Sequence, residues 1–346
     1  ARTRPLAHAI ELSDLVKGRQ DLVDKLLFQL GVMNRDDLAH EVFTRKVDEV
    51  KHAAPEKRIG QLALIIAGDD HLLTIYAHNS KLLLDKGFRV FGSVRKQADA
   101  DRLKSEFGAN FAPLVFDVTD EPAVLAAARE VRAALGGEKL AGLVNNAGMY
   151  VAGPVIGVPA DKFRQQMEVN VIGPVIATQA LAPLLGADTS LKGPPGRIVM
   201  ISSVAGKSGN PFSGAYAASK HAMEGLSESL RRELMLFGID VVIVAPGPVK
   251  TPIWSKGREA ADIGRYQNSP YLPALQKVSA YVQQLEAMGL PPEKIAEVIH
   301  DALTLPNPKV RYHVAPDTMR HVLAAVLPKR TMDKIIAKRL GLLPPA

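Results

Sequence analysis

The stretch RIVMISSVAGKSGNPFSGAYAASK, residues 197–220, contains the pattern that decides the fold. It begins with an apolar run that predicts a strand over residues 197–202 and continues through a loop of small and polar residues. A helical pattern over residues 216–237 follows. A strand that is apolar on both faces and leads into a helix is typical of a parallel sheet covered by helices on both sides.

The same alternation extends over most of the chain. Because crossovers between parallel strands are right-handed, it predicts an α/β fold with a doubly wound, Rossmann-like parallel sheet over residues 60–316, with ligands at the carboxyl ends of the strands. Strands are predicted at residues 62–67, 89–94, 113–116, 142–145, 197–202, 240–245 and 310–314, and helices at residues 121–135, 161–185, 216–237 and 293–303.

The segments outside the strand pattern are also predicted to be ordered. Residues 1–57 are poor in glycine and carry apolar residues at helical spacing, which predicts a helical N-terminal extension. Residues 317–346 predict a C-terminal helical tail. Residues 253–288 contain Gly257, Gly264 and Pro270 and predict a mobile lid over the substrate.

The composition of the chain limits its chemistry. Of 346 residues, 47% are hydrophobic, which indicates a folded globular protein. The absence of cysteine excludes disulfides, thiolate zinc sites and cysteine nucleophiles, and we expect no metal site. No apolar run has the roughly 20 residues of a membrane span, and the first residues lack an apolar leader. We therefore expect a cytoplasmic enzyme without a membrane span.

The net charge of +7 raises the question of a nucleic-acid partner. The charges are scattered, however, and aromatic residues make up only 5% of the chain, so we expect an anionic small ligand and no nucleic acid. The densest basic stretch, residues 329–339, alternates with apolar residues. It fits a solvated helix packed on one face, and peripheral contact with a membrane surface is the alternative.

Tyr216 and Lys220 are the sharpest pair of candidate catalytic residues. They are four residues apart in the predicted helix and so project from the same face. A neighbouring ammonium lowers the pKa of a phenol by stabilising the phenolate, which suits the phenol to general acid–base catalysis. Such a pair alone is usually a surface feature. Ser203, just after the preceding strand, and the small residues around Tyr216 favour the catalytic interpretation.

Further segments fit a ligand site. LVNNAG, residues 143–148, ends a buried strand with small residues that let the backbone approach a flat cofactor. Asn170 is polar within an apolar helical pattern, which fits either a satisfied core amide or a functional one. PGPVKTP, residues 246–252, is either a strand-ending turn or a loop that wraps a ligand.

At these positions the sequence resembles the short-chain dehydrogenase/reductase family. The resemblance is carried by FDVTD (116–120), LVNNAG (143–148), EVNVIG (168–173), the set Ser203, Tyr216 and Lys220 with its spacing, and PGPVKT (246–251), in the family's order. Residues 291–303 and 307–317 look, more loosely, like the hydroxysteroid- and retinol-dehydrogenase-like branch.

The resemblance implies a role for each matching residue. Tyr216 would be the general acid or base, Lys220 would lower its pKa and hold the nicotinamide ribose, and Ser203 would orient the substrate oxygen. Asn170 would anchor a water that relays protons to Lys220. The implied cofactor contacts are Asp117 and Val118 to adenine, Asn146, Ala147 and Gly148 along the cofactor, and Pro246, Gly247, Val249 and Thr251 around the nicotinamide.

The charge after the second predicted strand favours NADP(H) over NAD(H). Relatives that prefer NAD usually have an acidic residue there, which bonds the ribose hydroxyls. This chain reads FGSVRK over residues 91–96, so Ser93 and Arg95 take that position. An arginine can pair with the 2′-phosphate in a forked geometry.

The phosphate loop departs from the family pattern of Thr-Gly, three residues, then Gly-x-Gly. Of the glycines only Gly68 is present, and Asp69 and Asp70 add negative charge where a diphosphate would lie. Three explanations remain open at this point. The loop is remodelled and still binds cofactor, the chain is a degenerate relative that serves binding or assembly, or the residues before about Lys86 do not belong to the native sequence of the gene.

The expected activity is NADP(H)-dependent interconversion of a ketone or aldehyde with an alcohol. The substrate would be small and apolar, with steroid-, retinoid- and lipid-like carbonyls all compatible, and family analogy implies a homo-oligomer. The alternative is a binding or scaffold protein without catalysis. Substrate contacts are expected from Ser203, Met149, Tyr150 and Trp254, with Tyr266, Tyr271, Leu272 and Tyr281 in segments that border the pocket.

Overall fold

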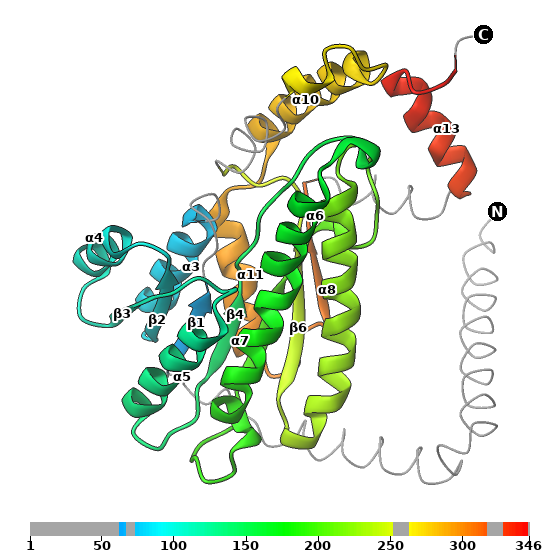
Figure 1. Ribbon diagram of the computed structural model, residues 1–346. Helices are drawn as coiled ribbons and strands as arrows, with labels where there is room; N and C mark the ends of the chain where they lie inside the picture. Colours follow the sequence, from blue (N-terminus) through cyan, green and yellow to red (C-terminus); the bar gives the residue numbers. More distant parts are fainter. Residues whose placement is uncertain (1–61, 67–72, 252–262, 317–327, 345–346) are drawn as a thin grey trace, which may run out of the picture. The chain divides into compact units, whose positions relative to one another are not determined.

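A seven-stranded parallel sheet forms the centre of the molecule (Figure 1). The structure is a computed structural model that describes residues 62–66, 73–251, 263–316 and 328–344. The strand order β3-β2-β1-β4-β5-β6-β7 confirms the predicted doubly wound sheet. The strands are β1 (Leu62–Ile66), β2 (Arg89–Val94), β3 (Phe111–Val115), β4 (Gly142–Asn145), β5 (Arg197–Ile201), β6 (Asp240–Pro246) and β7 (Arg311–Val314).

Helices cover both faces of this sheet, and each face has its own hydrophobic core. One core contains residues of α3 (Leu73–Asp85), α4 (Gln97–Phe107) and α11 (Pro292–Thr304). The other contains residues of α5 (Glu121–Leu135), α7 (Gly173–Ala182) and α8 (Gly214–Glu233) (Figure 1). α8 continues into the 3₁₀ turn η5 (Leu234–Phe237).

The strands read as continuous apolar runs because successive side chains enter different cores. In β5, Ile198 and Met200 lie in the core with α5, α7 and α8, whereas Val199 and Ile201 lie in the core with α3, α4 and α11. All four side chains are at most 5% exposed. This burial on both faces is what the sequence pattern predicts for a parallel strand.

The helix predicted over residues 161–185 is observed as one long helical segment with two irregular turns. It consists of α6 (Ala160–Met167), the π-helical turn η2 (Glu168–Ile172), α7, and a second π-helical turn η3 (Pro183–Ala187). Within the described ranges this segment is the one helix long and apolar enough to cross a membrane, with a mean hydropathy of 1.5. Half of that apolar window is buried inside the protein, as in a core helix, so it is weak support for a membrane span.

The carboxyl ends of the strands lead into the loops where a ligand site is expected. β1 and β4 are neighbours, and the chain crosses to opposite sides of the sheet from this point, which makes it the topological switch. β4 leads, by the 3₁₀ turn η1 (Val155–Gly157), to α6, and β5 leads to the 3₁₀ turn η4 (Val204–Gly206) and then to α8.

The C-terminal segments form a smaller apolar cluster beside the sheet. The 3₁₀ turn η6 (Ile263–Tyr266), α10 (Leu272–Met288) and α13 (Lys329–Leu340) follow β6 and β7. Phe212, Tyr266 and Leu275 are buried together, and Leu340 packs against them. The described part of the predicted lid, residues 263–288, is largely a regular helix, whereas residues 252–262 and the predicted extension 1–57 lie outside the described residues.

Candidate active site

The end of β5 and the first turns of α8 bring three predicted catalytic residues together. Ser203 follows β5, and Tyr216 and Lys220 lie one turn apart on α8. Lys220 Nζ donates a hydrogen bond to the carbonyl oxygen of Ile201 at 2.8 Å and lies 5.7 Å from the centroid of the Tyr216 ring. The Ser203 hydroxyl is hydrogen-bonded to Tyr216.

Burial sets the protonation states of Tyr216 and Lys220. It raises the pKa of Tyr216 to about 12, which outweighs the lowering effect of the hydrogen bond to Ser203. It lowers the pKa of Lys220 to about 8, against the raising effect of the Glu224 charge. At neutral pH Tyr216 is therefore protonated and Lys220 is mostly charged. The expectation that Lys220 brings the pKa of Tyr216 toward neutrality is not met in this structure, because burial of the phenol dominates.

Tyr150 lies directly against Tyr216. The two rings are in an edge contact with their centroids 5.1 Å apart, and the Tyr150 and Ser213 hydroxyl oxygens are 2.7 Å apart. Burial raises the pKa of Tyr150, so its hydroxyl stays protonated. The predicted substrate residue Tyr150 thus forms a wall beside Tyr216.

Asn170 is buried in the π-helical turn η2 and holds the segment after β4. Its Oδ1 accepts from the backbone N–H of Met149 at 2.8 Å, and its Nδ2 donates to the Met149 carbonyl at 3.1 Å and to Ser219 Oγ at 2.9 Å. Gln166, one turn earlier, accepts from the N–H of Val151 and donates to the Met149 carbonyl, both at 2.8 Å. These contacts describe a satisfied amide that positions Met149. The water relay implied by the family resemblance stays a prediction.

The residues after β4 fit a polar, flat group such as a dinucleotide. Asn146 is 2% exposed, and in the part of the chain that the structure describes neither polar atom of its amide has a hydrogen-bond partner. A buried amide without partners is costly, so this site suits a ligand that can both donate and accept hydrogen bonds. Ala147 and Gly148 are also buried and line the same strand end.

The ends of β2 and β3 place a cation beside a carboxylate. Ser93 is fully buried, and the Arg95 guanidinium lies 3.8 Å from the Asp117 carboxylate. Asp117 Oδ1 also accepts from the backbone and hydroxyl of Thr119 at 2.9 and 2.7 Å, which fixes the carboxylate in a turn. Val118 is 3% exposed and belongs to the core, so the side chain implied to touch adenine packs inward.

The end of β6 is tightly packed. Gly247 donates to the carbonyl of Val314 at 2.8 Å, and a Cβ at this position would lie 2.9 Å from that of Ala315. Pro246 ends β6, and Val249 and Thr251 are buried beyond it. The structure therefore gathers the predicted nicotinamide loop near the carboxyl edge. Gly68 and Trp254, also predicted as site residues, lie outside the described residues.

The fold and the site together define a class of protein, an α/β oxidoreductase. Residues 72–262 match the family model described as short chain dehydrogenase, and the chain belongs to this family. It is 42% identical over 258 residues to the NADPH-dependent 3-dehydrocapnine reductase of Ornithobacterium rhinotracheale, covering 74% of this chain and 90% of the relative. It is 32% identical over 265 residues to retinol dehydrogenase 5 of Mus musculus, covering 72% and 80%. A short-chain dehydrogenase from Streptomyces avermitilis aligns with a TM-score of 0.63 and 25% identity over 81% of this chain and 94% of that structure.

The structure also reveals residues that the sequence analysis missed. Gln166 shares one helix face with Asn170 at a spacing of four, a signal that the sequence offered. The buried carboxylate of Glu224 forms an ion pair with the partly buried guanidinium of Arg311, and the two residues are 87 positions apart, so no local pattern connects them.

Proposed function

We propose that the chain is an NADP(H)-dependent oxidoreductase that interconverts a ketone or aldehyde with an alcohol on an apolar, steroid-, retinoid- or lipid-like substrate. The observation that carries this proposal is the convergence of Ser203, Tyr216 and Lys220 at the carboxyl end of β5. A hydroxyl, a protonated phenol and an ammonium are the groups that a carbonyl oxygen needs when it gains negative charge and then a proton.

Each residue of this set has a defined part in carbonyl reduction. The reduced nicotinamide, when bound, supplies the hydride that adds to the carbonyl carbon. Ser203 donates a hydrogen bond to the carbonyl oxygen and so orients it. Tyr216, protonated because burial raises its pKa to about 12, gives its proton to that oxygen. Lys220 stabilises the resulting phenolate with its positive charge, and in alcohol oxidation the proton moves in the opposite direction.

The residues at the carboxyl edge would hold the cofactor. Asn146 offers a buried amide with both polar atoms available to a ligand. Arg95, at the end of β2, supplies the positive charge that a 2′-phosphate requires, and residues 93–96 contain no carboxylate. The similarity to a reductase named as NADPH-dependent supports the same preference.

An apolar substrate is supported by the surroundings of Tyr216 and by the relatives. Tyr150 packs against the catalytic ring, and the backbone of Met149 is held beside it by Asn170. One relative is named for retinol, an apolar alcohol. The test is NADPH consumption by the purified chain with ketones and aldehydes of increasing apolar length. Turnover that rises with apolar size would support the proposal, whereas cofactor binding without turnover on any carbonyl would favour a non-catalytic binding protein.

A further inference from the structure

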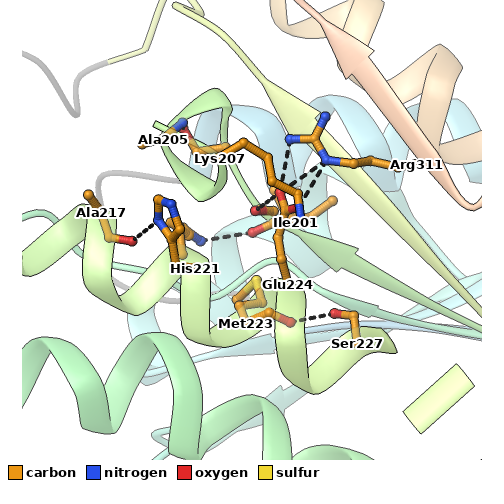
Figure 2. A network of polar contacts seen from close by, with 12 residues as sticks. Ile201, Ala205, Lys207, Ala217, His221, Met223, Glu224, Ser227 and Arg311 are labelled. Carbon is orange, nitrogen blue, oxygen red and sulfur yellow. Dashed lines mark hydrogen bonds and ion pairs between the residues drawn. The ribbon is translucent and has the colours of Figure 1, made fainter. Parts of the chain in front are cut away.

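Glu224 is a buried carboxylate one helical turn beyond the catalytic lysine. It is 2% exposed and lies on α8, four residues after Lys220. Arg311, on β7, donates to both carboxylate oxygens: its Nε lies 3.1 Å from Oε1 and 3.0 Å from Oε2, and one Nη lies 2.9 Å from Oε1 (Figure 2). This two-oxygen contact fixes the Glu224 side chain in one orientation.

The same carboxylate binds the end of the strand that carries Ser203. Ser202 Oγ donates to Glu224 Oε1 at 3.0 Å. Lys207 Nζ lies 3.2 Å from Glu224 Oε2 (Figure 2). Three consecutive residues at the end of β5 therefore contact α8: Ile201 through Lys220, Ser202 through Glu224, and Ser203 through Tyr216. The contact between Ser202 and Glu224 is the middle one of these three, so it helps to set the position of Ser203 relative to Tyr216.

The backbone of Gly206 packs closely against Glu224 and Ser202. A Cβ at Gly206, in η4, would lie 2.5 Å from Glu224 Oε1 and 2.7 Å from Ser202 Oγ. Burying an ion pair is costly, and apolar residues of similar volume are often as stable. Stability alone therefore does not explain a buried carboxylate that contacts Arg311, Lys207 and Ser202.

The charges around Lys220 give a reason for the buried carboxylate of Glu224. Glu224 faces Lys220 from its own helix, while Arg311 from β7 and Lys207 from the end of η4 bring two cations to the same carboxylate. Burial alone would raise the pKa of Glu224, but the contacts with Arg311, Ser202 and Lys207 lower it by more than burial raises it. The carboxylate is therefore ionised at neutral pH. Without that negative charge, Lys220 would keep its hydrogen bond to the carbonyl oxygen of Ile201, and the nearby charges of Arg311 and Lys207 would disfavour its ammonium.

We propose that Glu224, held by Arg311, is a positioning residue that keeps Lys220 charged and fixes Ser203 against Tyr216. The inference rests on the proposed function, because the charge of Lys220 and the place of Ser203 matter to catalysis only if Tyr216 transfers a proton. Sequence spacing alone does not show this role, since Arg311 approaches only through the pairing of β6 with β7.

Substitutions of Glu224 and of Arg311 are expected to shift the pKa of Lys220 in opposite directions, which nuclear magnetic resonance can measure. The ε-carbon chemical shift of isotopically labelled lysine reports ionisation, and Lys220→Arg assigns the Lys220 signal. Glu224→Gln removes a negative charge and is expected to lower the apparent pKa of Lys220 by about one pH unit. Arg311→Met removes a positive charge and is expected to raise it by a similar amount. Shifts in the same direction, or no shift in either variant, would overturn the proposal.

Two further variants separate this role from general damage. Asp188→Asn breaks a more exposed ion pair with Arg132, in which the two charged atoms are 2.6 Å apart. Asp188 precedes β5, whereas Ser203 follows it, so this variant is expected to leave the Lys220 titration unchanged. If Glu224→Gln fails to fold, a double variant, Glu224→Met with Arg311→Met, can replace it, because it removes both charges of the ion pair together. It is expected to titrate like the wild type at Lys220 and to lose about tenfold in kcat, because Ser202 loses its anchor. A double variant with wild-type kcat would contradict the positioning role.

The activity measurement distinguishes the two proposals. In an active enzyme, the alkaline limb of the kcat profile is expected to move to lower pH in Glu224→Gln and to higher pH in Arg311→Met. Opposite titration shifts in a chain without carbonyl turnover would refute the proposed function and leave the effect of Glu224 on Lys220 standing. If the chain turns over carbonyl substrates but the pKa of Lys220 is the same in both variants as in the wild type, only the role of Glu224 is refuted.

Discussion

Replacing Tyr216 by phenylalanine removes the proposed proton donor and leaves the ring in place. The hydroxyl makes a hydrogen bond with Ser203, so its loss is expected to cost about 1 kcal/mol of the free energy of unfolding. The edge contact with Tyr150, at 5.1 Å between ring centroids, is retained. We therefore expect a folded variant with an unchanged affinity for NADPH.

The effect on turnover follows from the protonation state of the phenol. Because burial raises the pKa of Tyr216 to about 12, the proton is present throughout the neutral range. A positioned general acid contributes roughly 100- to 10,000-fold to a rate, or about 3–5 kcal/mol of activation free energy. Tyr216→Phe is expected to lose at least the lower of these factors in kcat.

The assay is NADPH consumption with an apolar ketone, with Tyr312→Phe as the matched control. The Tyr312 hydroxyl accepts a hydrogen bond from the backbone of Lys309, before β7 and at the edge of the sheet opposite the site, at 3.2 Å. This control is expected to keep the wild-type kcat. A Tyr216→Phe variant with the kcat of the control would refute the assignment of Tyr216 as proton donor.

Three further substitutions test the electrostatics and packing around the site. The pKa of Lys220 falls from 10.5 to about 8 on folding, so its charge destabilises the folded state below about pH 8, and this penalty vanishes above about pH 10.5. Lys220→Met should therefore raise the free energy of unfolding by up to about 3 kcal/mol at pH 7 and by little at about pH 11. Equal gains in the free energy of unfolding at both pH values would contradict this. Arg95→Ala should weaken NADPH binding about tenfold more than NADH binding in calorimetry, and equal losses would remove the argument for a 2′-phosphate contact. Gly92→Ala places a Cβ against the Tyr76 hydroxyl and should lower the free energy of unfolding by about 1–3 kcal/mol in denaturant titration. Gly225→Ala adds a Cβ that meets no atom within 4 Å and should raise the free energy of unfolding by about 0.5–1 kcal/mol. Equal effects of the two substitutions would show that the close packing at Gly92 does not matter to stability.

The strands were predictable because burial on both faces leaves a direct trace in the sequence. Neighbours such as Ile198 and Val199 enter different cores, so both must be apolar, and the run stands out from the helical periodicity around it. The π-helical turn η2 (Glu168–Ile172) was not predictable, because one extra residue in a turn barely changes the apolar pattern of a long helix.

The segment predicted as a lid shows a local structure that the sequence did not reveal, and its mobility stays a prediction. The lid prediction rested on Gly257, Gly264 and Pro270, which all precede α10 (Leu272–Met288), a helix with Pro273 in its first turn. Proline is compatible with that position because the first N–H groups of a helix have no partner within it. The apolar side chains of Leu275 and Val278 then pack into the cluster with Phe212, a contact that only the tertiary fold determines.

The proposed catalytic residues and the ion pair between Glu224 and Arg311 differ in how directly the sequence reveals their contacts. Ser203, Tyr216 and Lys220 are close in sequence and lie on adjacent elements, so their spacing indicates their proximity. Glu224 and Arg311 meet across 87 residues, through the last strand of the sheet, and their contact depends on the complete strand order. Sequence spacing therefore predicted the proximity of Ser203, Tyr216 and Lys220 and missed the ion pair between Glu224 and Arg311.

Titration of the purified chain with NADPH and with NADH, followed by calorimetry, tests the proposed function most directly. We expect micromolar binding of NADPH and weaker binding of NADH, because Arg95 and the buried Asn146 amide offer a charge and hydrogen bonds to the cofactor. Binding of neither nucleotide would contradict it, and the assembled Ser203, Tyr216 and Lys220 would then belong to a family member that no longer carries out the reaction.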